Sequence, residues 1–303
     1  MIKKTTYLIL TLITSTVILS CEKEIEISIP ASQSQYVVEA SINTRFPFLN
    51  YVFITNTVDY FKPDLSLNGV KNALVFITPG IIFGSDTIFN DTDRIQLIAI
   101  DTLAKLIPAL DSLIGSFSGV YMNPILLQGK ENTHYRLDIT LMDGTKILGR
   151  TTIPKIVPID SFSYRKEKVI NRKEIQAFLT FWITDGPEKN NYRMAVRNYT
   201  DSILYGWGAA DFYRTFDDEL LNNGVRPFMF SNSWDEGDTV NIYFSQIGRK
   251  EFFFWQSFGQ AANNGGPFAT AGSVKSNITS HPSNSVIGSF TGYALDFKQI
   301  ILK

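Results

Sequence analysis

The feature that most constrains the fold of this 303-residue chain is a strict alternation of apolar and polar residues in short segments. In the clearest segment the apolar positions are Tyr135, Leu137, Ile139 and Leu141. A period of two places one face of a β-strand against a core and the other toward solvent. Asp143-Gly144 follows, a pair typical of tight turns, and residues 146–151 return as the partner strand. The segment therefore predicts a β-hairpin.

Similar alternation recurs along the chain, at residues 35–42, 51–56, 73–78, 175–183 and 192–196. It predicts an all-β fold with one or two helices, arranged as two antiparallel β-sandwich-like domains. Two domains also suit the length. Roughly 280 residues remain after an N-terminal leader, and a single hydrophobic core usually serves fewer residues than that. Pro154 and Pro158 interrupt ladder pairing between the halves. We therefore expect an N-terminal β-sandwich domain over residues 35–155 and a C-terminal β-rich domain over residues 156–303.

One long helix is predicted near residues 245–264, with Ser245 as its N-cap and an Asn-Gly-Pro-rich stretch as its end. Its apolar stripe consists of Ile247, Phe254, Trp255, Phe258, Ala261 and Ala262. Such aromatic stripes usually face a core, and we interpret this one as core.

A second apolar segment, residues 95–117, has helical spacing but is broken by Pro108, so a short helix and turn are expected there. Two interpretations of its surplus apolar residues remain open. In one they form a partner-binding surface that includes Leu106, Leu110 and Leu113, because exposed apolar patches usually mark interaction sites. In the other the segment folds back as ordinary core.

The N-terminus carries the marks of an export signal over residues 1–20. Lys3 and Lys4 precede an uncharged, largely apolar stretch that ends at Cys21. A transmembrane helix needs about 20 consecutive apolar residues, and this stretch is shorter and broken by threonine and serine. Ile18-Leu19-Ser20 before the cysteine resembles a lipobox, so we predict lipidation of Cys21, with residues 21–34 as a tether. The alternative is a lone core cysteine after an ordinary signal peptide.

Composition and rare residues exclude several classes of function. A net charge of −1 offers no basic stripe for nucleic acid, and a single cysteine allows no internal disulfide. His134 and His281 stand in no metal-ligand spacing, so we expect no metal, no cofactor and no catalytic triad. We interpret the carboxylates at Asp217, Asp218 and Glu219 as solvated turn residues. The protein is therefore expected not to be an enzyme.

A short motif recurs in which Asp is followed by Ser or Thr and then by an aliphatic residue. It resembles the O-glycosylation site of exported Bacteroidetes proteins, although such pairs also suit turns and caps. The hydroxyl residues concerned are Thr87, Thr102, Ser112, Ser202 and Thr239. We predict modification of at least one of them.

The order of several segments resembles a Bacteroidetes outer-membrane lipoprotein family known as the domain of unknown function 4249. The segments are Cys21-Glu22-Lys23-Glu24-Ile25-Glu26-Ile27, Tyr36-Val37-Val38-Glu39-Ala40, His134-Tyr135-Arg136-Leu137, Thr152-Ile153-Pro154, 181–187, Asn191-Tyr192, 218–224, Gly266-Pro267-Phe268-Ala269 and Ser276-Asn277-Ile278. The resemblance implies an all-β lipoprotein, often encoded near TonB-dependent receptors, and supplies no catalytic residues.

Two function classes follow from this. The first is a non-enzymatic outer-membrane lipoprotein facing the cell exterior, which acts as an accessory or substrate-capture partner of a TonB-dependent transporter. The acidic run at residues 22–26 resembles the surface-export signal of such lipoproteins. The alternative is a structural or adhesive cell-surface lipoprotein without a transport role.

Overall fold

The computed structural model describes residues 35–57, 69–84, 86–106, 118–123, 125–168, 175–198, 212–219, 224–234, 237–263, 273–283 and 285–303. Residues 34–303 belong to one compact unit. The first eight strands are β1 (Tyr36–Asn43), β2 (Tyr51–Asn56), β3 (Leu74–Phe83), β4 (Asp86–Phe89), β5 (Ile95–Ala99), β6 (Val120–Met122), β7 (Thr133–Thr140) and β8 (Lys146–Ile153). The remaining strands are β9 (Ile159–Lys168), β10 (Ile175–Asp185), β11 (Asn191–Asn198), β12 (Phe212–Asp217), β13 (Gly224–Trp234), β14 (Thr239–Ile247), β15 (Ile278–His281) and β16 (Val286–Ile301).

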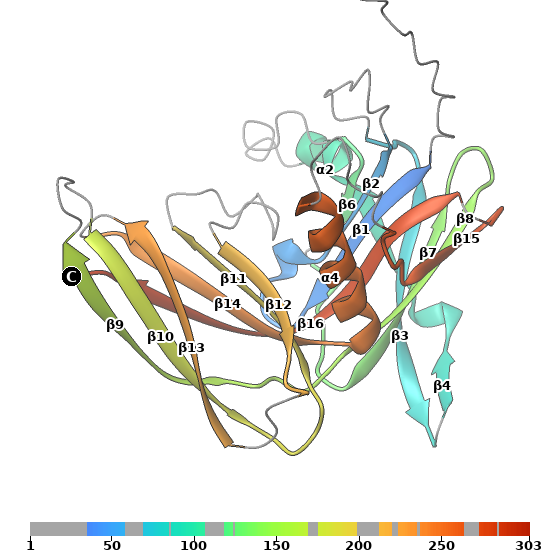
Figure 1. Ribbon diagram of the computed structural model, residues 1–303. Helices are drawn as coiled ribbons and strands as arrows, with labels where there is room; N and C mark the ends of the chain where they lie inside the picture. The colour runs from blue at the N-terminus through green and yellow to red at the C-terminus, as the bar shows by residue number, and fades with distance from the viewer. Residues whose placement is uncertain are drawn as a thin grey trace, which may run out of the picture. The chain divides into compact units, whose positions relative to one another are not determined.

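Within the described ranges the helices are the 3-10 helices η1 (Pro47–Leu49) and η2 (Asp91–Asp93) and the α-helices α2 (Ile100–Leu106) and α4 (Arg249–Asn263), of which Figure 1 labels α2 and α4. None of the helices in the described ranges is long and apolar enough to span a membrane. The expected all-β class with one or two helices and sandwich-like layers is thus confirmed.

The first core lies inside a sheet that folds back on itself. β5 pairs with β6 through Ile98 and Ala99 and with β3 through Ile95, Gln96 and Leu97, so one strand joins the two layers. The inward residues alternate along β1, β2, β3, β7 and β8, as the sequence predicts, and among them Leu137, Ile139 and Ile147 are fully or almost fully buried. The β7–β8 hairpin forms at the predicted place, with Gly144 at a φ of +86° in the turn.

The second core lies between two sheets. One is the β12-β11-β14-β16 part of the large sheet, and the other is the three-stranded sheet β13-β10-β9. Leu179, Phe181 and Ile183 of β10 meet Phe244 and Tyr192 across this core, with Phe181 and Phe244 ring centroids 5.4 Å apart. The opposite face of β11 and β14 is covered by α4, where Phe252 packs with Tyr243 and Ile247. β14 is therefore buried on both faces.

The 16-residue strand β16 belongs to both halves of this unit. Its first half, residues 286–293, pairs with β1, and its second half, residues 294–301, pairs with β14. The same division appears in the cores, since Phe290 lies in the first and Ile300 in the second. The two cores therefore separate β1–β8 from β9–β14 close to the expected boundary at residues 155 and 156, but β15 and β16 return from the second half to the first.

Two details differ from the sequence expectations. The β1–β16 pair is parallel, so the sheets are not purely antiparallel. The long helix begins at Arg249 rather than at the expected N-cap Ser245, because Ser245 pairs with β11 and β16, and Ile247 with β11, as part of β14. The predicted apolar stripe is wrong at three positions: Ile247 is buried but belongs to a strand, Phe258 is 42% exposed, and Ala262 is also exposed.

Candidate functional site

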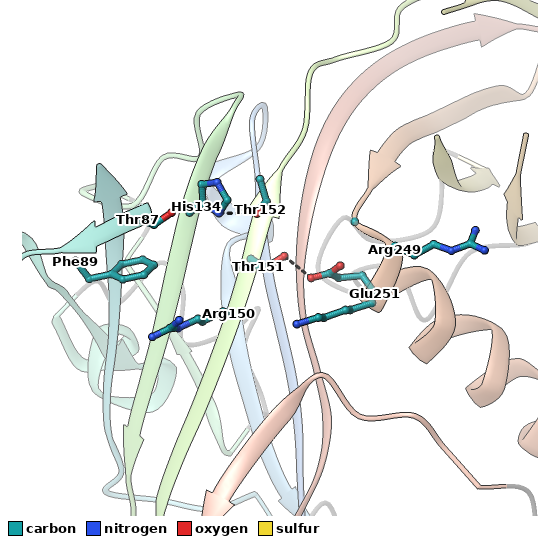
Figure 2. Close-up of a pocket in the computed structure, with 10 residues that line it drawn as sticks. Thr87, Phe89, His134, Arg150, Thr151, Thr152, Arg249 and Glu251 are labelled. Carbon is teal, nitrogen blue, oxygen red and sulfur yellow. Dashed lines mark hydrogen bonds between the residues drawn. The ribbon is translucent and has the colours of Figure 1, made fainter. Parts of the chain in front are cut away.

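A pocket of about 350 Å³ lies where the β7–β8 hairpin meets the beginning of α4 (Figure 2). Its lining comes from β4, β7, β8 and the first turn of α4, and comprises Thr87, Phe89, His134, Arg150, Thr151, Thr152, Gly248, Arg249, Lys250 and Glu251. β15 pairs with β8 only as far as Gly149. The later residues of β8 therefore form the edge at which α4 begins.

The side chain of Glu251 fixes α4 to this edge. Its carboxylate accepts a hydrogen bond from the Thr151 hydroxyl at 2.8 Å and another from the Asn277 side-chain amide at 3.1 Å. Glu251 is the third residue of α4, and its carboxylate fills the space beside Gly248 where a Cβ would stand, an arrangement typical of helix capping. Burial raises the pKa of Glu251, and hydrogen bonds from its own amide, Thr151 and Asn277, with the charge of Lys250, oppose that effect. The pocket wall is thus held by a buried network.

The cations around the pocket differ in how they are neutralised. Arg249 forms ion pairs with Asp217 and Glu219 at 3.0 and 3.3 Å, and Figure 2 shows it pointing away from Glu251. Arg150 lies over the Phe89 ring, 5.5 Å from its centroid. Within the described part of the chain neither Arg150 nor Lys250 has a carboxylate within ion-pair distance. The pocket therefore presents two cations that have no carboxylate partner among the described residues.

The β3–β4 hairpin carries an exposed apolar surface on the face opposite Thr87, which we term the hairpin surface. Its large side chains are Ile81 (64% exposed), Phe83 (75%) and Ile88 (54%), whereas Ile82 (53%) is the cross-strand partner of Thr87 and lies on the other face. Ile81 and Ile88 are cross-strand partners, and Phe83 stands on the face of Ile81, two residues further on. The β3–β4 hairpin extends past the neighbouring strands (Figure 1). Alternation thus places these three residues opposite the face of Thr87, which lines the pocket.

A buried polar cluster lies at the other sheet edge, near the end of β10. The hydroxyl of Tyr192 donates to Asp185 at 2.6 Å, and Asp218 accepts from the Asn190 backbone amide at 2.9 Å. Burial, aided by the Asp185 carboxylate, raises the pKa of Asp218. Asp218 is 4% exposed, so its interpretation as a solvated turn residue is wrong. Its contacts hold the β10–β11 connection against the end of β12.

The two histidines lie far apart. His134 Nδ1 is hydrogen-bonded to the Thr152 hydroxyl at 2.9 Å, whereas His281 pairs with Lys146 at the other end of β8. Six residues of strand between these points correspond to roughly 20 Å. Among the described residues no three His, Cys, Asp or Glu side chains are grouped so as to hold a metal ion.

The residues singled out from sequence have varied places. Thr87 is half-buried in the pocket lining, Thr102 is exposed on α2, and Thr239 is half-buried at the start of β14. Leu106 is the last residue of α2, with its side chain outside the described set. The remaining candidates lie outside the described residues: Cys21, Ser112, Ser202, Leu110 and Leu113.

Sequence reasoning missed the pocket residues Arg150, Lys250 and Glu251. One signal for the last was present, since Glu251 follows Gly248 by three residues, the spacing of a capping interaction. The cations carried no such signal, because single Arg and Lys residues on an alternating strand or a helix end are ordinary surface residues.

The fold and the site together define a class of protein. It is β-rich, it has two hydrophobic cores, and it carries a polar pocket and an exposed apolar hairpin. The chain belongs to the family described as Domain of unknown function (DUF4249), whose model matches residues 22–299. Among solved structures it is similar to a DUF3823 family protein from Bacteroides uniformis, at 9% identity and a TM-score of 0.24, over 89% of this chain and 100% of that chain. A similarity at that score carries no argument here. The search of curated proteins finds no match.

Proposed function

We propose that the protein is a non-enzymatic lipoprotein anchored through Cys21 in the outer membrane of a Gram-negative bacterium of the Bacteroidetes type, facing the cell exterior. In this proposal it serves as an accessory or substrate-capture partner of a TonB-dependent transporter. The lipobox-like residues before Cys21 and the acidic run after it support the anchor and its location. Three acyl chains anchor firmly, because each buried methylene adds about 0.8 kcal/mol.

The observation that carries the partner role is the hairpin surface. Three large apolar side chains, Ile81, Phe83 and Ile88, each more than half exposed, lie on one face of the paired ends of β3 and β4. Single exposed apolar residues are common, but a contiguous group at the end of a hairpin usually marks a protein contact. A lipid anchor and a 14-residue tether, which spans at most about 50 Å, would keep the protein near the membrane and so near a membrane-embedded partner.

Copurification from gently detergent-extracted membranes tests the proposal. We expect a transporter barrel to copurify in stoichiometric amount with the intact lipoprotein. The double substitution Phe83→Ser and Ile88→Ser should abolish this without lowering the urea midpoint, because both side chains are already exposed in the folded protein.

The matched control is Met142→Ser with Met229→Ser, which removes two equally exposed apolar side chains elsewhere, at 77% and 69% exposure. It should retain the partner. If no barrel copurifies with the unmodified protein, the structural or adhesive alternative replaces the transport role. If the hairpin variant keeps its barrel, the hairpin surface is not the contact. Resistance of the protein to protease added to intact cells would contradict exposure on the cell exterior.

A further inference from the structure

We propose that the pocket between β8 and α4 binds the oxyanion group, a carboxylate, phosphate or sulfate, of a small polar molecule, with Arg150 and Lys250 as its two charged contacts. This inference is independent of the transporter role, because it concerns the isolated protein and a solute. It rests on three features of the site: the charges, the frame that holds them and the size of the cavity.

The charge balance favours an anion. Arg136 and Arg150 face each other across the β7–β8 pair, and both guanidinium groups lie over Phe89, at 5.4 and 5.5 Å from the ring centroid. Asp91 and Asp138 neutralise Arg136, but among the described residues no carboxylate pairs with Arg150. A guanidinium held by an aromatic ring keeps its N–H edge available for a planar or tetrahedral oxyanion.

Hydrogen bonds hold the two backbone segments that carry Arg150 and Lys250 in place relative to each other. Arg150 is the neighbour of Thr151, and Lys250 is the neighbour of Glu251, the two residues joined by a buried hydrogen bond of 2.8 Å. The Thr151 hydroxyl also accepts the Gly292 amide at 2.8 Å, and Asn277 joins Glu251 to Phe290. The backbone segments that carry Arg150 and Lys250 are therefore held by four elements before any ligand arrives, which lowers the entropic cost of binding.

The acidic residue of the lining does not cancel these charges. The carboxylate of Glu251 is directed to Thr151, Asn277 and the first turn of α4, and the residue is only 4% exposed. The volume of about 350 Å³ lies at the small end of ligand pockets. Hydroxyl groups of Thr87 and Thr152 and the ring of His134 add polar contacts suited to a compact, hydroxylated molecule.

Isothermal titration calorimetry on the purified protein, at constant ionic strength, tests the site with four probes: inorganic phosphate, glucose 6-phosphate, glucuronate and, as the uncharged control of matching size, glucose. We expect saturable binding of at least one anionic probe and at least tenfold weaker binding of glucose. A comparison of the affinities for phosphate and glucose 6-phosphate with the affinity for glucuronate distinguishes a phosphate-type ligand from a carboxylate-type ligand.

The double variant Arg150→Gln and Lys250→Gln should lower the affinity for the anionic probe at least tenfold. Lys146→Gln, at the other end of the same strand, is the control for net charge and should leave binding unchanged. The circular dichroism and urea midpoint of both variants should match the unmodified protein, because all three side chains are exposed. The proposal would be overturned if the double variant and the Lys146→Gln control lost the same amount of affinity for the anionic probe. It would also be overturned if glucose bound as tightly as the anionic probes, or if no anionic probe bound saturably.

Discussion

Replacing Gly288 by alanine tests the junction at which β16 joins the two halves of the fold. Gly288 lies opposite Val38 in the parallel β1–β16 pair and has a φ of +155°. A Cβ on this glycine would lie 1.8 Å from the carbonyl oxygen of Val38 and 2.7 Å from its carbonyl carbon. Both are backbone atoms, so no side chain can rotate away, and the strands must separate by roughly 1.5 Å to restore an ordinary contact.

The expected cost follows from two contributions. The backbone conformation is strained for any residue with a Cβ, at about 1–3 kcal/mol. Separating the strands also weakens β1–β16 hydrogen bonds, each with a net contribution of about 1 kcal/mol. We expect Gly288→Ala to lower the free energy of unfolding by about 3 kcal/mol, which for a chain of this size lowers Tm by roughly 6–12 °C.

Urea denaturation followed by tryptophan fluorescence measures the effect, with Gly259→Ala as the control. Gly259 lies inside α4, and a Cβ there meets nothing within 4 Å. The same substitution should therefore raise the free energy of unfolding by about 0.5–1 kcal/mol, because glycine is unfavourable in a helix interior. The same glycine-to-alanine substitution should thus lower the free energy of unfolding at position 288 and raise it at position 259. A Gly288→Ala protein within 0.5 kcal/mol of the unmodified protein would refute the reasoning about the β1–β16 contact.

Three further predictions concern other parts of the chain. Cys21→Ala should leave the protein unlipidated, because no other residue offers the acylated thiol; mass analysis that finds Cys21 as a free internal thiol in the unmodified protein would contradict lipidation. At least one of Thr87, Thr102, Ser112, Ser202 and Thr239 should carry a glycan, with Thr102 favoured over Thr87 and Thr239 by its exposure, and an intact mass equal to polypeptide plus lipid would exclude this. Glu251→Gln should gain stability relative to the unmodified protein as pH rises from 4.5. The raised pKa means that the folded state retains a proton that the unfolded state releases above that pH, and glutamine does not ionise. Urea midpoints of the two proteins between pH 4.5 and 7.5 measure this, and a constant or opposite difference contradicts it.

Local pattern predicted the inner faces of the strands well. Leu137 and Ile139 lie in the first core and Leu179, Phe181 and Ile183 in the second, because a period of two depends only on neighbours along the chain. It did not predict the parallel pairing of β1 with β16. Alternation tells which face of a strand is buried but not which strand lies beside it, and these two are separated by most of the chain.

The start of the long helix shows how a strand end can match helical spacing. In β14 nearly every residue is buried, since one face meets Phe181 and Tyr192 in the second core and the other meets α4. Val240, Ile242 and Phe244 alternate with polar residues, but Ile247 precedes Phe254 by seven residues, a spacing that also places two residues on one face of a helix. Ile247 therefore fitted the helical stripe, although it is the last residue of the strand. The first turn of α4, Arg249 to Glu251, is polar, and its residues line the pocket.

The pocket escapes sequence reasoning for a further physical reason. Its lining comes from four separate parts of the chain, and each cation taken alone is what a solvated surface residue looks like. What distinguishes Arg150 from Arg136 is the absence of a carboxylate partner within the described residues, a property of the space around the side chain rather than of its type. What distinguishes Lys250 is that its neighbour Glu251 is bonded to the neighbour of Arg150, 100 residues earlier in the sequence. Two ordinary cations thus become one site only when β8 and α4 meet, because the tertiary contact, and not either residue alone, brings them to the same pocket.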